Sequence, residues 1–391
     1  MRIFQPVRLK EIRIARGLTE ERVAESLGLT KQMISKYETN VSIPYQDTLS
    51  NMARLFRVPL VYFDKPDTAV ACRCSALFYK TSTNTPGKAV DLARVHCKWI
   101  SEIVQECREI HKETRSGTNG IPAPNLPRLP DQCSPYESAD LLREHWGLGD
   151  EPISHLVGSL EANGIIVSTH PSPGLQTDGY AQIVDSLPVI FMNSHKGTAV
   201  RQRFLLAQAL GHLLMHCDLS ESEYRLKQKH YDAEANAFAE RFLLPAFGLD
   251  NMAAPADLAR FVELKRHWKV SIAAMITHCI DNGVMAVEAA KAKKRLYRQY
   301  GRKDEPLDDV LPLEQPSLLA SIFTERIVDD DSFAALMNTL ALPVDIIESL
   351  VGLTPGFLAD YFGDGEDWYS GLSSGLQPPP EQMTMFDTDE L

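Results

Sequence analysis

Residues 8–44 read RLKEIRIARGLTEERVAESLGLTKQMISKYETNVSIP, and this stretch decides the fold of the amino-terminal part of the chain. Its apolar residues recur at helical spacing in three short segments, with Leu9 and Ile12, then Val23, Ala24 and Leu27, then Ile34 and Tyr37. Thr19 and Thr30 each precede a segment as candidate N-caps, and Gly28 stands where the chain must turn sharply. The pattern predicts a helix-turn-helix, whose second helix enters the major groove of DNA.

At these residues the stretch resembles the XRE (Cro/repressor-like) DNA-binding domains, and the resemblance continues through residues 49–63. It implies a lambda-repressor-like helical domain that binds a double-stranded DNA operator. The residues that it assigns to DNA binding are Thr19, Thr30, Lys31, Gln32, Ser35, Lys36 and Asn40. Gln32 and the lysines carry donors suited to base edges, whereas Thr30 and the backbone near Asn40 would hold phosphate. The family usually has Gln where this chain has Glu20, so we expect weaker anchoring there or a Glu20 turned to solvent.

A second constellation consists of residues 203–216, RFLLAQALGHLLMH, and residues 234–245, EANAFAERFLLP. A zincin needs two His four residues apart on one helix face, with a Glu after the first as general base. The two segments resemble the ImmA/IrrE metallopeptidases, which carry H-E-x-G-H and then E-A-N-x-F-A. In this resemblance Gln208 replaces the first His ligand and Ala209 replaces the catalytic Glu, while His212 and Glu234 match the second His and the later Glu ligand.

These replacements predict a pseudo-peptidase without a resident metal or cofactor. Gln offers a neutral amide oxygen, which binds Zn²⁺ poorly compared with imidazole. Loss of a positioned general base typically costs about 10²–10⁴-fold in rate. One alternative stays open, because His212 and His216 are themselves four residues apart and could form a shifted zinc site with Glu234.

Length and composition bound the remaining possibilities. The 391 residues are too many for one ordinary core and suggest two or three domains. No run approaches about 18 apolar residues, and residues 1–6 lack the features of a signal peptide, so we expect a cytoplasmic protein without a membrane span. Seven scattered cysteines fit reduced thiols, and Cys72 and Cys74 form a lone C-x-C without a partner pair at zinc-ribbon spacing.

We therefore expect an α+β chain that is mostly α, with a small β-sheet in the ImmA/IrrE-like part. Strand-like runs lie close together at residues 164–169, 181–184 and 188–192. The expected divisions are a helix-turn-helix domain (1–68), a helical connector and loop (69–130), a zincin-like domain (131–302), an acidic helical region (303–365) and a disordered acidic tail (366–391).

Charge is distributed unevenly along the chain. The whole chain has a net charge of −12. Residues 1–45 hold eight basic and five acidic side chains, whereas residues 302–391 hold three basic and nineteen acidic ones. The acidic end would repel phosphate, so packing, self-association or partner binding suits it better than DNA. In the tail, the run Gln382, Met383, Thr384, Met385 and Phe386 resembles the short peptide that docks on the bacterial sliding clamp, although five residues are a weak signal.

The function that these features predict is a sequence-specific transcriptional regulator, acting as a repressor. A homodimer would place two recognition helices one DNA turn, ~34 Å, apart. The ImmA/IrrE-like part would set the oligomeric state and sense a small-molecule effector or a protein partner. Two alternatives remain open: a zinc-dependent endopeptidase with a non-standard metal site, and an antitoxin-like protein-interaction scaffold.

Overall fold

The computed structural model describes most of the chain, in segments. They are residues 4–66, 75–81, 87–114, 120–170, 177–193, 197–245, 257–281, 283–284, 286–302, 304–327 and 330–358. Cys72, Cys74, the tail at 366–391 and its segment from Gln382 to Phe386 lie outside the described residues. The five cysteines within them form no disulfide.

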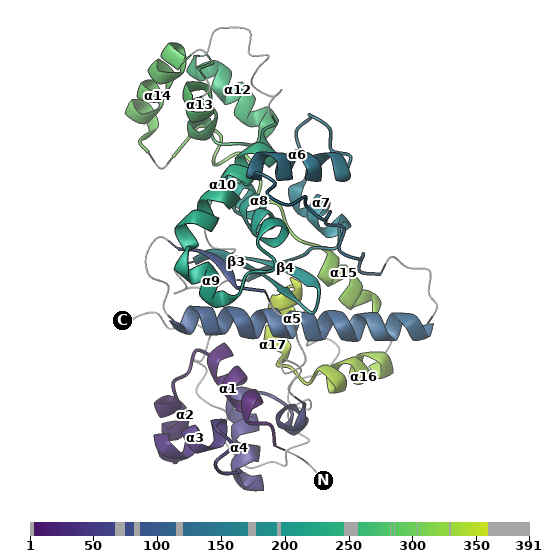
Figure 1. Ribbon diagram of the computed structural model, residues 1–391. Helices are drawn as coiled ribbons and strands as arrows, with labels where there is room; N and C mark the ends of the chain where they lie inside the picture. Colours follow the sequence, from purple (N-terminus) through teal and green to yellow (C-terminus); the bar gives the residue numbers. More distant parts are fainter. Residues whose placement is uncertain are drawn as a thin grey trace.

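The amino-terminal part is the predicted helix-turn-helix bundle (Figure 1). It comprises α1 (Pro6–Ala15), α2 (Glu20–Leu27), α3 (Lys31–Glu38), α4 (Gln46–Phe56) and the short 3₁₀ helix η1 (Leu60–Asp64). Thr19 and Thr30 are the N-caps of α2 and α3, and Gly28 ends α2 with φ of 63°, which explains the sharp turn. The two helices pack closely because Ala24 is small and buried.

A small mixed sheet forms the centre of the second part, with strand order β1-β3-β4-β2. β2 (Ile166–His170) is parallel to β4 (Leu187–Asn193), and β3 (Thr177–Val184) is antiparallel to β4. These three strands were predicted. The fourth, β1 (Phe78–Thr81), was not: it comes from the connector and pairs antiparallel with β3 at the edge of the sheet.

Helices cover the sheet on one face and extend away from it. α6 (Pro135–His145), α7 (Leu156–Ala162), α8 (Ala199–Met215), α9 (Glu221–Leu226) and α10 (Gln228–Leu243) belong to the zincin-like part. α12 (Leu258–Trp268), α13 (Ile272–Asp281) and α14 (Ala286–Tyr300) form a lobe at the end of the molecule farthest from the helix-turn-helix bundle (Figure 1). The mostly α, α+β class is therefore confirmed.

The long helix α5 (Gly87–Thr114) lies between the bundle and the sheet, as Figure 1 shows. The acidic region adds α15 (Leu318–Glu325), α16 (Asp330–Leu340) and α17 (Val344–Val351), which pack against α5 and β2. Among the described residues no single helix could cross a membrane; α16 and α17 pass that test only as a pair bent by 97°.

Two apolar cores meet at the sheet. One core joins the helix-turn-helix bundle, α5, the acidic helices and one sheet face, including Val189 and Phe191. The other core joins α6–α8, α10, α12–α14 and the opposite sheet face, including Ile190 and Met192. The alternation along β4 is the two-residue period of a strand buried on both faces. The helix-turn-helix bundle thus shares an apolar core with the sheet.

Candidate functional site

The outward face of α3 carries the residues that the sequence assigned to DNA. Lys31, Gln32 and Lys36 are exposed, and Ser35 is half-buried. Ile34 and Tyr37, on the other side of the helix, are buried in the bundle. The arrangement leaves long polar side chains free to enter a groove while the apolar residues hold the helix in place.

The predicted phosphate-binding residues lie around the ends of these helices. The Thr19 hydroxyl accepts a hydrogen bond from the Arg22 N–H at 3.2 Å, and that of Thr30 accepts one from the Met33 N–H at 3.3 Å. Each hydroxyl keeps its own hydrogen as a donor. Asn40 is exposed and adopts a left-handed backbone with φ of 59° just after α3. Both threonines therefore cap a helix, and the side chain of Thr19 also hydrogen-bonds Glu21.

An ion pair that the sequence did not reveal restrains Lys31. Its ammonium donates to the carboxylate of Glu21, on α2. This hydrogen bond raises the pKa of Lys31 and lowers the pKa of Glu21. The two residues lie ten apart in sequence, so only the angle between the helices brings them together. The sequence had instead singled out Glu20, which is half-buried at the start of α2.

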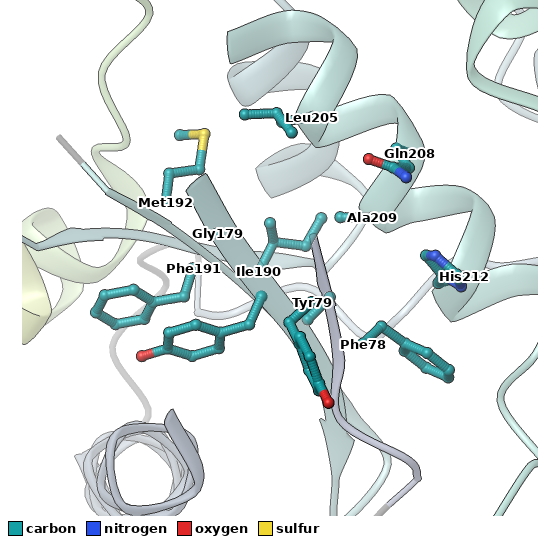
Figure 2. Close-up of a pocket in the computed structure, with 12 residues that line it drawn as sticks. Phe78, Tyr79, Gly179, Ile190, Phe191, Met192, Leu205, Gln208, Ala209 and His212 are labelled. Atoms are coloured by element: carbon teal, nitrogen blue, oxygen red, sulfur yellow. The ribbon is translucent and has the colours of Figure 1, made fainter. Parts of the chain in front are cut away.

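A small cavity lies between the sheet and α8, at Gln208 and Ala209, where the family resemblance places the first metal ligand and the catalytic Glu (Figure 2). Its volume is about 30 Å³, enough for one or two water-sized groups. Gln208, Ala209 and His212 line it from α8, Phe78 and Tyr79 from β1. The cavity therefore depends on the strand contributed by the connector.

Gln208 and His212 keep the relative placement of the two family ligands, but their surroundings differ from those of a metal site. Gln208 is only 4% exposed and lines the cavity. The His212 ring stacks on Phe78, with centroids 4.8 Å apart and planes 9° from parallel. The aromatic ring of Phe78, on the connector strand β1, thus lies against the imidazole of His212.

His212 and His216 contact each other instead of converging on a common point. Their Nδ1 atoms are 3.0 Å apart, and the other ring nitrogen of His216 is 3.1 Å from Glu234 Oε2. His212 Nε2 lies 3.5 Å from Asp232 Oδ1. Burial lowers the pKa of His212, and burial is the main cause that lowers the pKa of His216 to about 3. Both rings are therefore neutral at pH 7.

Glu234 lies in a separate, open hollow of about 260 Å³ on the other side of His216, together with His230 and Tyr231. The structure therefore brings Gln208 and His212 into one cavity but does not bring Glu234 to them. It also separates the alternative set of His212, His216 and Glu234, because His216 uses opposite ring nitrogens toward its two neighbours. Across the described segments, no three His, Cys, Asp or Glu side chains are arranged to hold a metal ion. These residues do not fit the zinc that the family resemblance implies.

A buried charge network joins the helix-turn-helix bundle to α5. The guanidinium of Arg8, on α1, donates to both oxygens of Glu102, on α5, at 2.8 and 3.2 Å. Lys98 pairs with Glu11 beside it, and Lys65 lies 3.6 Å from Glu102. Burial alone would raise the pKa of Glu102, but the charge and hydrogen bonds of Arg8, aided by the lysines, hold it below its ordinary value. The bundle is thereby fixed on α5 by oriented, directional contacts.

The opposite side of α5 contacts the strands that form the cavity wall. His96 Nδ1 lies 3.0 Å from the Tyr180 hydroxyl, and the His96 ring stacks on Phe191. Tyr180 and Phe191 stack on each other with centroids 4.7 Å apart. In Figure 2 the Phe191 ring points away from α8, so the same strands bound the cavity on one face and support α5 on the other.

Comparison with known families agrees with this geometry. Residues 9–63 match the helix-turn-helix family, and residues 161–277 match the IrrE N-terminal-like domain family. A search of curated proteins finds no match. The chain is thus a fusion of an XRE-type helix-turn-helix domain with an ImmA/IrrE-type domain.

Proposed function

We propose that this fusion is a DNA-binding transcriptional repressor whose ImmA/IrrE-type domain has lost peptide hydrolysis and instead controls the helix-turn-helix bundle. The observation that carries the proposal is the position of α5, which contacts the bundle through Arg8 and Glu102 and the cavity wall through His96 and Tyr180. An occupant of the cavity that moved β3 would alter the packing of α5, and through it the presentation of α3.

The loss of hydrolysis is supported by three features of the site. Gln208 supplies a weak ligand, Ala209 supplies no base, and Glu234 lies in a different hollow. Zinc in purified protein, measured by atomic absorption, is expected to be far below one ion per chain. Peptide cleavage that a chelator abolishes would contradict the proposal and favour the peptidase.

DNA binding is tested by selecting bound duplexes from a random pool, with the DNA upstream of the gene as a direct candidate. The Lys36→Ala change should weaken binding to all sequences and reduce the salt slope by about 1, because it removes one phosphate or base contact. The Gln32→Ala change should relax the preference at one base position. A homodimer should protect two half-sites ~34 Å apart. Equal binding by both variants and the unaltered chain would reject α3 as the reader.

Control through α5 is tested by Tyr180→Phe, which removes the hydroxyl that contacts His96 and keeps the ring stacked on Phe191. Coupling along such a path amounts to about 0.5–2 kcal/mol, so operator affinity should change by about 2- to 30-fold. Tyr136→Phe, at an exposed position on α6, is the matched control. Identical affinity for the two variants would show that the cavity wall and the bundle are uncoupled.

A further inference from the structure

The lobe formed by α12, α13 and α14 is more basic than the helix-turn-helix domain. Residues 258–302 contain ten Lys and Arg against three Asp and Glu, whereas residues 1–45 contain eight against five. This excess is hidden in the overall charge of −12 by the acidic carboxyl-terminal end. The function proposed above makes no use of the lobe.

Most of the exposed positive charge lies on one face of α14. Lys291, Lys294, Arg295 and Arg298 are all exposed, and their spacing of three and four residues places them on a single side of the helix. The opposite side, with Ala289, Ala292 and Leu296, is buried in the lobe. The helix therefore presents a basic face about two turns long, and its apolar side is already covered.

The other lysines of the lobe each donate to a group of the described chain, and Lys269 donates to the backbone carbonyl of Ser154. Lys265 is fully buried and pairs with Glu305 and Asp308. Lys293 donates to the hydroxyl of Thr277. Within the described segments, the four side chains of the basic face make no ion pair with an acidic residue. They are therefore free to pair with an external anion.

We propose that the basic face of α14 is a second DNA-binding surface, which holds the phosphate backbone of a duplex without reading its sequence. Four flexible cationic side chains on a rigid helix can each contact a phosphate of a DNA backbone. Such contacts are electrostatic, so they need no pocket. The buried apolar side leaves α14 without the apolar face by which amphipathic helices enter a membrane surface. A long DNA held by α3 raises the local concentration of its own distant segments, so even weak phosphate contacts at α14 would be used.

The position of α14 determines what this surface does. α14 and α3 lie at opposite ends of the molecule, with the sheet and α5 between them (Figure 1). A short straight duplex on α3 therefore does not reach α14. One molecule would bridge two DNA segments, or hold a bent or looped one.

The experiment uses the full-length chain with Lys31→Ala, Gln32→Ala and Lys36→Ala, which removes reading by α3. This chain should still bind a 24-bp duplex of scrambled sequence. The logarithm of its affinity should fall with the logarithm of salt at a slope of up to about −4, since each phosphate contact contributes about −0.9. Replacing Lys291, Lys294, Arg295 and Arg298 by Gln should lower the affinity at 100 mM salt by at least tenfold and flatten the slope.

The matched control changes four exposed basic residues elsewhere, Arg128, Arg225, Lys227 and Lys229, to Gln. It alters the net charge equally and should change the affinity by less than twofold. Gln resembles Lys and Arg in helix propensity, so α14 should persist. If the variant with all four changes in α14 unfolds early in a thermal scan, the double variant Lys294→Gln with Arg298→Gln replaces it. The double variant should flatten the salt slope by about half as much.

A bridging assay completes the test. The unaltered chain on an immobilised duplex selected for α3 should capture a second, labelled duplex of scrambled sequence, and the fourfold α14 variant should not. The proposal is overturned if the chain altered in α3 fails to bind the scrambled duplex, or if the control loses affinity as much as the α14 variant. It is also overturned if a 24-residue poly-glutamate peptide or vesicles with 30% anionic lipid bind this face more tightly than DNA.

Discussion

Single side chains set how strongly this protein holds DNA, and Glu21 illustrates the effect. Its carboxylate takes one of the few cations on the DNA-facing surface, Lys31, and adds a negative charge near the expected phosphates. Exposed pairs of this kind contribute little to stability. We expect the pair to affect DNA binding more than folding, because Glu21 both offsets the charge of Lys31 and fixes the direction of its side chain.

We expect Glu21→Gln to tighten DNA binding about two- to tenfold at 100 mM salt and to steepen the salt dependence, because it frees Lys31 for phosphate. Fluorescence anisotropy over a salt series measures both quantities. Glu25→Gln removes an equal charge from α2, where Glu25 pairs with Arg22 and not with Lys31, and is the control. If the two variants gain equally, general electrostatics accounts for the change and the Lys31 pair does not.

The sequence located most residues of the two sites but not their partners. The caps Thr19 and Thr30 and the turn at Gly28 could be predicted because each depends on local chemistry. The contacts of Lys31 with Glu21 and of His216 with Glu234 depend on how helices cross, which no local pattern encodes. The stacking of Phe78 on His212 was equally hidden, since it requires a strand that had no clear signal.

At the level of elements, α5 contacts both the helix-turn-helix bundle and the sheet. Its sequence is amphipathic, yet in the structure it is buried on two sides, with charged residues such as Lys98 and Glu102 inside the interface. The sequence pattern of α5 suggests a connector with one apolar face. Its charged side is also buried in the structure, because Arg8 pairs with Glu102 and Glu11 pairs with Lys98. The three predicted strands, by contrast, were found because apolar β-branched runs are distinctive.

The Glu102→Gln change should lower the free energy of unfolding by about 3 kcal/mol at pH 7, because it leaves the Arg8 guanidinium buried without its main counter-ion. Urea unfolding followed by circular dichroism measures this. Asp140→Asn, which breaks the exposed pair with Arg241, should cost less than about 1 kcal/mol. Equal losses would show that the α5 network stabilises no more than a surface pair.

The same variant has a predicted dependence on pH. The pKa of Glu102 lies below its ordinary value in the folded chain, so its ionised form contributes stability above the ordinary carboxyl pKa. This contribution is lost as the pH falls through the folded value. The difference in unfolding free energy between the unaltered chain and Glu102→Gln should therefore be constant from pH 6 to 8 and shrink below about pH 4. A difference that grew in acid would contradict the ion-pair assignment.

On the scale of the whole molecule, the expected divisions of the chain and the packing units are not the same. The interval 69–130 supplies β1 and α5, which pack with the sheet, and the interval 303–365 supplies α15–α17, which pack on α5 and β2. Loops mark breaks in the chain, whereas the cores are built from segments on both sides of such breaks. The proposed function depends on these cores, because the helix-turn-helix bundle and the cavity wall both pack on α5.

The edge strand β1 has a practical consequence for anyone who dissects this molecule. A fragment of residues 131–302 omits β1 and α5, so it would present the bare backbone of β3 and an uncovered apolar sheet face. We expect such a fragment to self-associate in size-exclusion chromatography, and a fragment of residues 75–358 to elute as a defined species. A monomeric 131–302 fragment would contradict this expectation. Any exchange of the sheet-containing part between proteins would therefore have to carry β1 and α5 with it.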